Sequence, residues 1–421
     1  MNLAAGWMWC VVLALLAQVG VRLWLNGRQM RHVARHRDQV PSAYADAIDL
    51  AAHQKAADYT LAKARLVPLE VLLDAAVLLA WTLLGGLMAL NQGLLAWMGQ
   101  GLWQQVVLVL AFVALGALPG LPLSWWQTFR IEARWGFNQM TQRLWWSDLF
   151  KGALLGLVLG LPLVALVLWL MQAAGALWWL WAWGALVLWQ AALMVVAPRW
   201  IMPLFNRFEP LQDAALAERS RALMARAGFE AQGFFVMDGS KRSTHSNAFF
   251  TGLGRSKRVV FFDTLLAQLD ADEMQAVLAH ELGHFHHRHL LWRLLTSWGT
   301  SLLGLALLGW LAQQTWFYTG LGVVPSMTGH NEALALLLFL QVTPVFGFFL
   351  APWSNARSRQ HEFEADAYAR AQTDGAALRR ALLKLYRDNA STLTPDPLYV
   401  RFYFSHPPAS ERLQRLQGSP A

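Results

Sequence analysis

Charged residues are scarce in this chain. Asp, Glu, Lys and Arg make up 14% of its 421 residues, whereas a soluble globular protein usually carries about 25%. Hydrophobic residues reach 56%, and 23 residues are Trp. The low charge argues against a soluble protein and indicates burial in a lipid bilayer, and abundant Trp fits a chain that meets two water–lipid interfaces.

Cysteine is nearly absent, and so are basic runs mixed with aromatic residues. Cys10 is the single cysteine, which excludes an intramolecular disulfide and any cysteine-rich zinc site. We expect Cys10 to be a small buried side chain. The net charge is +8, but the basic residues are scattered along loops, so we expect no nucleic-acid partner.

Long apolar runs predict about seven transmembrane helices, since about 20 apolar residues cross the hydrocarbon core of a bilayer. The first run lacks the basic start and cleavage site of a signal peptide, so we interpret it as a span. The expected spans are residues 3–25, 67–90, 102–125, 152–171, 174–196, 290–312 and 333–352.

Loop charge predicts the orientation. The loop 26–66 is rich in Lys and Arg, and the loops at 91–101, 172–173 and 313–332 contain none. By the positive-inside rule the N-terminus lies outside, and the large polar segments and the C-terminus lie in the cytosol. The preference for Arg, Ala and Leu favours a bacterial source, and therefore the bacterial inner membrane.

Two polar segments, 197–289 and 353–421, show mixed secondary structure. Helical periodicity predicts helices at 214–227, 271–284, 360–371 and 375–387, and β-rich runs predict strands at 233–237, 247–250 and 258–262. Asp270 is a suitable N-cap for the second helix, with Glu273 three residues later.

The helix expected at 271–284 carries a motif that can bind a metal ion and transfer a proton. His280 and His284 are four residues apart, so both imidazoles lie on one helical face and can reach one zinc ion. Glu281 lies beside the first ligand, where its carboxylate can accept a proton from a water that zinc activates. The alternative is a pair of surface histidines beside a surface glutamate.

A catalytic zinc needs a third protein ligand and one open position. Glu362 is our candidate. Asp366, one helical turn later, could orient a ligand imidazole, and Arg359 could hydrogen-bond in the same region. The alternative is a solvated acidic helix face. The rival candidates for the third ligand are four nearby histidines: His286, His287, His289 and His361. We interpret those at 286–289 as a polar collar at the membrane interface.

Beyond the zinc motif, matches along nearly the whole chain resemble the type I CAAX prenyl endopeptidases, the membrane zinc proteases that mature a-factor and prelamin A. The matching stretches are 53–59, 136–138, 203–206, 238–243, 246–248, 262–265, 362–366 and 405–408.

The resemblance implies that His280, His284 and Glu362 bind one zinc ion and that Glu281 is the general base and acid. It also implies that a substrate peptide pairs with the strand at Asn247 and Ala248, and that His406 contacts the substrate or the oxyanion. In this family seven helices surround a large membrane chamber. Without the resemblance, Asn247 would be read as capping a turn and His406 as ending a helix.

We therefore predict an all-α polytopic membrane protein with a cytosolic, gluzincin-like α+β zinc protease domain. Residues 1–196 would form five spans, 290–352 two more, and 197–289 and 353–421 the two parts of the catalytic domain. The expected activity is hydrolysis of peptide bonds in prenylated or membrane-associated substrates. Alternatives are a general quality-control protease with the same chemistry, and a transporter or scaffold with a structural zinc.

Overall fold

The computed structural model describes residues 2–229, 232–251, 258–327 and 329–417. Within these ranges six helical segments are long and apolar enough to span a membrane: Leu3–Arg35, Leu102–Glu132, Gln142–Ala173, Gly175–Phe205, His289–Leu311 and Glu332–Gln372. A seventh is added if Leu50–Trp81 and Gly86–Met98, which are bent by 46°, form one span. The expectation of about seven spans is confirmed.

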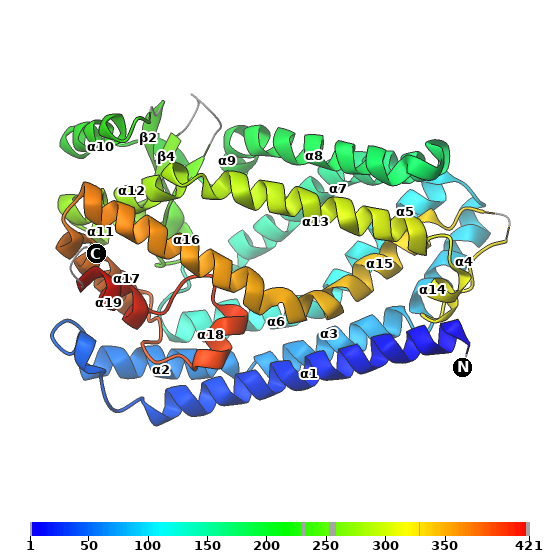
Figure 1. Cartoon of the computed structure of the whole chain (residues 1–421), viewed down its shortest axis with the longest axis horizontal. Helices are drawn as coiled ribbons and strands as arrows, with labels where there is room; N and C mark the ends of the chain where they lie inside the picture. The colour runs from blue at the N-terminus through cyan, green and yellow to red at the C-terminus, as the bar shows by residue number, and fades with distance from the viewer. Residues whose placement is uncertain (1, 230–231, 252–257, 328, 418–421) are drawn as a thin grey trace.

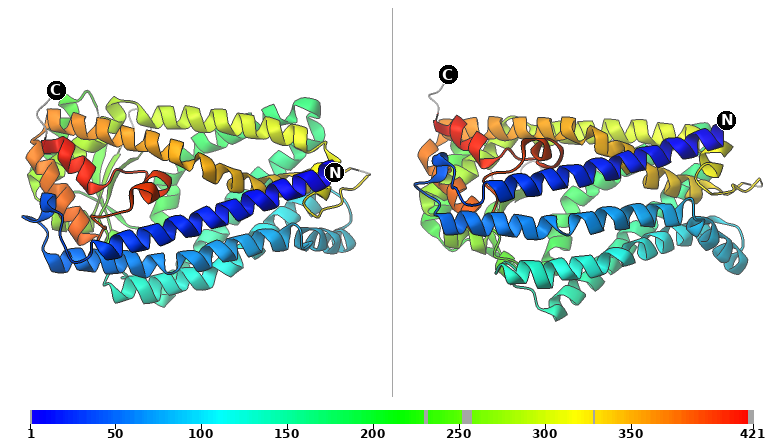
Figure 2. Two further views of the ribbon diagram at one scale, coloured as in Figure 1. Left: turned by 60° about the horizontal axis from the view of Figure 1, so that its bottom comes forward. Right: turned by 90° about the horizontal axis from the view of Figure 1, so that it is seen from below.

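The long helices run roughly along the longest axis of the molecule, and the sheet lies at the end away from the N-terminus (Figures 1 and 2). The helices of the membrane half and its loops are α1 (Leu3–Arg35), α2 (Leu50–Ala64), α3 (Val67–Trp81), α4 (Gly86–Met98), α5 (Leu102–Ala117), α6 (Leu121–Trp126), α7 (Gln142–Ala173), α8 (Trp178–Val196), α9 (Met202–Phe205), α13 (His289–Leu311), α14 (Thr315–Thr319) and α15 (Glu332–Gly347).

The structure corrects several boundaries. The expected span 67–90 is divided into α3 and α4, because Gly85 takes a left-handed conformation with φ of 81° that the α-helix cannot continue through. Helix α1 extends ten residues past 25 and packs against α2. The turn from α15 to α16 is helical, so the expected boundary at 352/353 lies inside one segment, Glu332–Gln372. Cys10, which we expected to be buried, is exposed on α1.

A four-stranded sheet forms in the other half, in the order β1-β2-β4-β3. Strand β2 pairs in parallel with β4, and the two outer strands pair antiparallel with their neighbours. The three expected strands are present, with β3 shifted by one residue, and β1 was not predicted. The bounds are β1 (Phe208–Pro210), β2 (Gly233–Met237), β3 (Ala248–Thr251) and β4 (Arg258–Phe262).

Helices pack against this sheet and share a hydrophobic core with it that is separate from the core of the membrane half, and all four expected helices are present. The capping box at the start of α12 is confirmed, since Asp270 accepts hydrogen bonds from the first turn and Glu273 accepts one from the Asp270 N–H. The helices are α10 (Ala214–Arg226), α11 (Asp263–Gln268), α12 (Ala271–His286), α16 (Ala351–Gln372), α17 (Gly375–Asp388), α18 (Pro397–Tyr403) and α19 (Ala409–Gln417).

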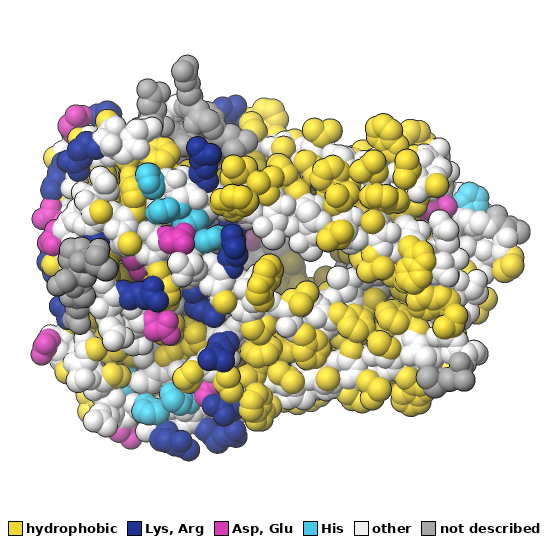
Figure 3. All heavy atoms as spheres, viewed as in Figure 1, with side chains coloured by type: hydrophobic (Ala, Val, Ile, Leu, Met, Phe, Trp, Pro, Cys, Tyr) yellow, Lys and Arg dark blue, Asp and Glu magenta, His cyan; other side chains and the backbone are white. Residues whose placement is uncertain are grey.

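The surface also has a polar part, over the half that contains the sheet, and an apolar part, over the membrane half. On the face shown in Figure 3, charged and histidine side chains gather over the end formed by α10–α12, α17 and α19, and hydrophobic side chains cover most of the rest. Large apolar side chains such as Trp97, Leu188 and Leu303 are exposed. An apolar exterior this extensive is what a bilayer would cover. A hollow opens near the middle of this face (Figure 3).

Helices α12 and α16 approach each other closely at Gly283. A Cβ atom placed on Gly283 would lie 2.8 Å from Ala365 Cα and 3.0 Å from its carbonyl oxygen. These neighbours are backbone atoms, which cannot move aside as a flexible side chain can. The two helices can therefore lie this close only because residue 283 has no side chain.

We expect Gly283→Ala to destabilise the protein by about 1–3 kcal/mol, the usual cost of overpacking a core, and to lower its metal content. Thermal unfolding and metal analysis of the purified protein in detergent measure both. Gly299→Ala in α13 is the control, because nothing lies within 4 Å of the added atom. Wild-type stability and metal content in Gly283→Ala would contradict this view of the helix contact.

Candidate metal centre

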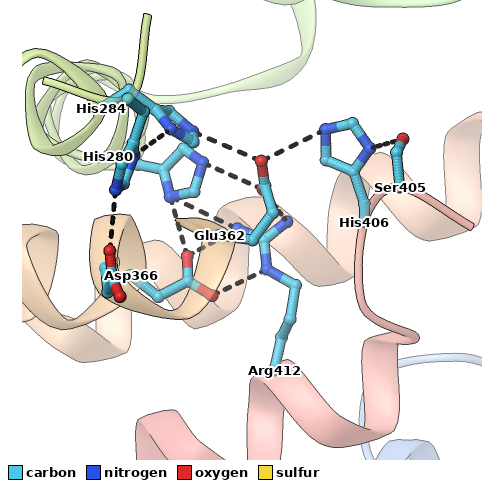
Figure 4. A network of polar contacts seen from close by, with 9 residues as sticks. His280, His284, Glu362, Asp366, Ser405, His406 and Arg412 are labelled. Carbon is cyan, nitrogen blue, oxygen red and sulfur yellow. Dashed lines mark hydrogen bonds and ion pairs between the residues drawn. The ribbon is translucent and has the colours of Figure 1, made fainter. Parts of the chain in front are cut away.

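Helices α12 and α16 bring three potential metal ligands together (Figure 4). His280 Nε2 lies 3.4 Å from Glu362 Oε2, and His284 Nε2 lies 3.3 Å from Glu362 Oε1. The two histidines lie one turn apart on α12, and Glu362 faces them from α16. The structure thus assembles the His-His-Glu set that the sequence predicted.

The geometry and charge of this group fit a metal ion. Four ligand atoms about 2.0–2.1 Å from a tetrahedral zinc lie about 3.3–3.4 Å from one another, which matches the spacings here. Glu362 Oε2 is buried and has no hydrogen-bond partner, so it is free to bind an ion. Burial lowers the pKa of His280, but the carboxylates of Asp366 and Glu362 outweigh it and raise the pKa to about 9. A site that favours a charged imidazole favours a bound cation.

Asp366 lies behind His280, as the spacing on the helix predicted. Its Oδ1 atom is 2.8 Å from His280 Nδ1, so it holds the ring by the nitrogen that faces away from Glu362. Arg412 of α19 donates two hydrogen bonds to Asp366, of 2.6 and 2.8 Å, and is 7% exposed. Sequence reasoning missed Arg412. Its only signal is an Arg on the apolar side of an amphipathic helix, which is weak without the fold.

The neighbouring histidines do not join the metal group formed by the described residues. His286 and His287 are exposed, as a polar collar would be. For His289 that interpretation is wrong: it is 3% exposed, and its Nδ1 lies 3.0 Å from His284 Nδ1. The ring of His361 stacks on His289 with centroids 4.0 Å apart.

Arg359 does not take the place expected from its spacing. Its Nη1 donates hydrogen bonds to the carbonyl oxygens of Val400 and Phe404, at 3.2 and 2.7 Å. The side chain therefore supports the segment that leads to His406 rather than a metal ligand. Helical spacing predicts which residues share a face, but a long flexible side chain can reach a different partner.

The metal group opens into a cavity of about 440 Å³ whose lining includes Glu281, Asn247, Ala248 and His406. Glu281 is half-buried beside His280. His406 Nε2 lies 3.5 Å from Glu362 Oε1, and its Nδ1 contacts Ser405 Oγ (Figure 4). Asn247 Oδ1 accepts the Ala248 N–H, and the Asn247 carbonyl pairs with Phe262 at the end of β4.

A second cavity, of about 540 Å³, adjoins the first at His406. Its lining includes Tyr59 and Lys63 of α2 and Val67 of α3, so it faces the membrane half. His406 thus lies where the metal cavity meets the space between the long helices.

Comparison with known proteins decides the family. The model of the CAAX prenyl protease N-terminal region, with five membrane helices, matches residues 29–207, and the model of peptidase family M48 matches residues 210–419. CAAX prenyl protease 1 of Saccharomyces cerevisiae is 37% identical over 321 residues, covering 72% of this chain and 70% of the relative. The chain belongs to the CAAX prenyl protease 1 family.

Two relatives with lower sequence identity match nearly the whole of this chain. Probable CAAX prenyl protease 1 of Schizosaccharomyces pombe is 31% identical, covering 98% of this chain and 89% of the relative. The crystal structure of S. mikatae Ste24p superposes with a TM-score of 0.91 at 31% identity, covering 98% and 99% of the two chains. The predicted fold is confirmed, and the protein is a membrane zinc metalloendopeptidase of the CAAX prenyl protease type.

We expect Arg412→Ala to lower stability and metal affinity together, because Asp366 would keep a buried charge without its partner. Breaking a buried ion pair costs about 3–5 kcal/mol. Thermal unfolding and zinc titration of the purified variant test this. Arg415→Ala is the control, because Arg415 lies on the same helix but packs on the ring of Phe363. Wild-type stability in Arg412→Ala would contradict the role of this pair.

Proposed function

We propose that this protein cleaves prenylated CAAX-type peptides next to the lipid-modified cysteine, with one zinc ion per chain. One observation carries the proposal: a His-His-Glu metal group and Glu281 face a single cavity with an edge strand along its side. The names of the matched relatives supply the substrate class.

Bound zinc supplies a Lewis acid that polarises the peptide carbonyl and lowers the pKa of a water to about 7. The protein supplies the proton transfers. The Glu281 carboxylate takes a proton from the attacking water and then delivers it to the nitrogen of the leaving amine. Asp366 holds His280 in orientation while the reaction proceeds.

The substrate backbone pairs with β3 in this proposal. This strand is at the edge of the sheet, and Asn247 and Ala248 lie in the metal cavity. An extended peptide added to such an edge gains main-chain hydrogen bonds whatever its side chains. Asn247 binds the substrate backbone, and His406, across the cavity, hydrogen-bonds the oxygen of the attacked carbonyl.

For the location, we propose the bacterial inner membrane, with the N-terminus outside and both catalytic segments, 197–289 and 353–421, in the cytosol. The Lys and Arg content of alternate loops supports the orientation, and the preference for Arg, Ala and Leu supports the bacterial source. The membrane spans within residues 1–196 and 290–352 then hold the catalytic domain against the bilayer.

We expect Glu281→Gln to keep its zinc and lose activity by a factor of about 10²–10⁴, because the amide keeps the shape but cannot take a proton. Metal analysis and peptide cleavage measure the two effects. Glu411→Gln on the exposed side of α19 is the control. An active Glu281→Gln enzyme would show that another group transfers the proton.

The substrate is tested with two peptides of one sequence, one farnesylated and one not, with and without a zinc chelator. We expect cleavage of the farnesylated peptide alone, and none with chelator. Equal cleavage of both peptides would replace the proposal with a general quality-control protease. No cleavage by the zinc-loaded protein would favour a structural zinc in a transporter or scaffold.

A further inference from the structure

His289 occupies an unusual position between α12 and α13. Arg288 takes a left-handed backbone conformation, with φ of 55°, which is uncommon for a residue with a side chain. Helix α12 ends at His286 and α13 begins at His289, so only two residues connect the helices. The three residues before His289 are exposed, whereas His289 is 3% exposed. The turn thus directs one histidine back toward the metal group.

A chain of polar contacts runs outward from the metal ligand His284. Its Nε2 faces Glu362, so Nδ1 is the nitrogen that faces away from the metal group. That Nδ1 lies 3.0 Å from His289 Nδ1. His289 Nε2 in turn lies 2.8 Å from Glu364 Oε2. The order is Glu364, His289, His284.

The contact between His289 and Glu364 determines which ring nitrogens of His289 and His284 carry a proton. An ionised carboxylate only accepts hydrogen bonds, so His289 Nε2 must carry a proton and donate it to Glu364. In a neutral imidazole the other nitrogen is then an acceptor. His289 Nδ1 therefore accepts, and His284 Nδ1 donates. The His284 Nε2 lone pair is left unprotonated, which is the state that a metal ligand needs.

We propose that His289 is a positioning residue, held by Glu364, that fixes the tautomer and the ring orientation of the metal ligand His284. The proposal rests on the metal group of the proposed function, but not on which peptide is cleaved. His280 is held directly by Asp366, and His284 has no such carboxylate of its own among the described contacts. Glu364 therefore acts on His284 indirectly, through His289.

Further contacts restrict both members of this chain. Gln360 donates a 3.1 Å hydrogen bond to Glu364 Oε1, which leaves Oε2 for His289. The His361 ring lies nearly parallel to the His289 ring, at an interplanar angle of 10°, and limits its rotation. Partners behind a metal-bound imidazole are worth about 10- to 100-fold in metal affinity.

The test measures zinc affinity by competition with a chromophoric chelator, using full-length protein in detergent. We expect His289→Ala to bind zinc about 10- to 100-fold more weakly, and His289→Asn to recover part of this, because its amide oxygen can accept from His284 Nδ1. The cobalt-loaded His289→Ala protein should also show an altered visible absorption band, since the ligand ring is free to tilt. His286→Ala is the control, because His286 is exposed and its ring packs on Tyr368 rather than on His289.

A double-mutant cycle separates positioning from packing. If His289 transmits the effect of Glu364, adding Glu364→Ala to His289→Ala should weaken zinc binding no further. Additive losses, or a His289→Ala protein that loses thermal stability but keeps wild-type zinc affinity and cobalt spectrum, would overturn the proposal. Should His289→Ala fail to fold, His289→Asn and Glu364→Ala carry the same comparison.

The outcomes also separate this proposal from the proposed function. Wild-type protein that binds no zinc would refute the metal group itself. Wild-type protein that binds zinc with an affinity unaffected by His289→Ala and Glu364→Ala would refute only the positioning role. Wild-type protein that binds zinc in a His289-dependent way but cleaves no farnesylated peptide would refute only the substrate.

Discussion

The contact between α12 and α16 at Gly283 is the constraint on which the site depends. Two metal ligands lie on one helix and the third on the other, so the spacing of ligand atoms is set by the distance between two helix axes. The missing side chain at Gly283 lets the Ala365 backbone approach closely. A metal ion tolerates only a few tenths of an ångström in its ligand distances, so a single glycine determines whether the ligands match it.

The metal site also requires that the charges of its buried side chains be balanced. Glu362 and Asp366 are two carboxylates in a buried region, and Arg412 is the cation that accompanies them. Arg412 makes both of its short contacts with Asp366 and is 3.9 Å from Glu362. One negative charge is thus left facing His280 and His284. A buried charge is costly unless an opposite charge lies beside it, and a bound cation meets that requirement.

The sequence was most informative where local rules apply. Four residues of spacing place His280 and His284 on one helical face, and apolar length identifies the spans, whatever the rest of the fold. It was least informative where distant segments meet. Arg412 approaches Asp366 only after α19 packs on α16, and Arg359 turned to the segment before His406. The sequence alone predicts an interfacial His289, because nothing in it reveals the left-handed turn at Arg288.

The order of the ligands along the chain has a consequence for biosynthesis. His280 and His284 are made before α13 and α15, and Glu362, His406 and Arg412 are made after them. A nascent chain that has completed α12 therefore holds only part of the metal group. The group closes only once the last two membrane helices have been made and α16 has returned to α12. The metal group therefore cannot be complete before the last two membrane helices have been made.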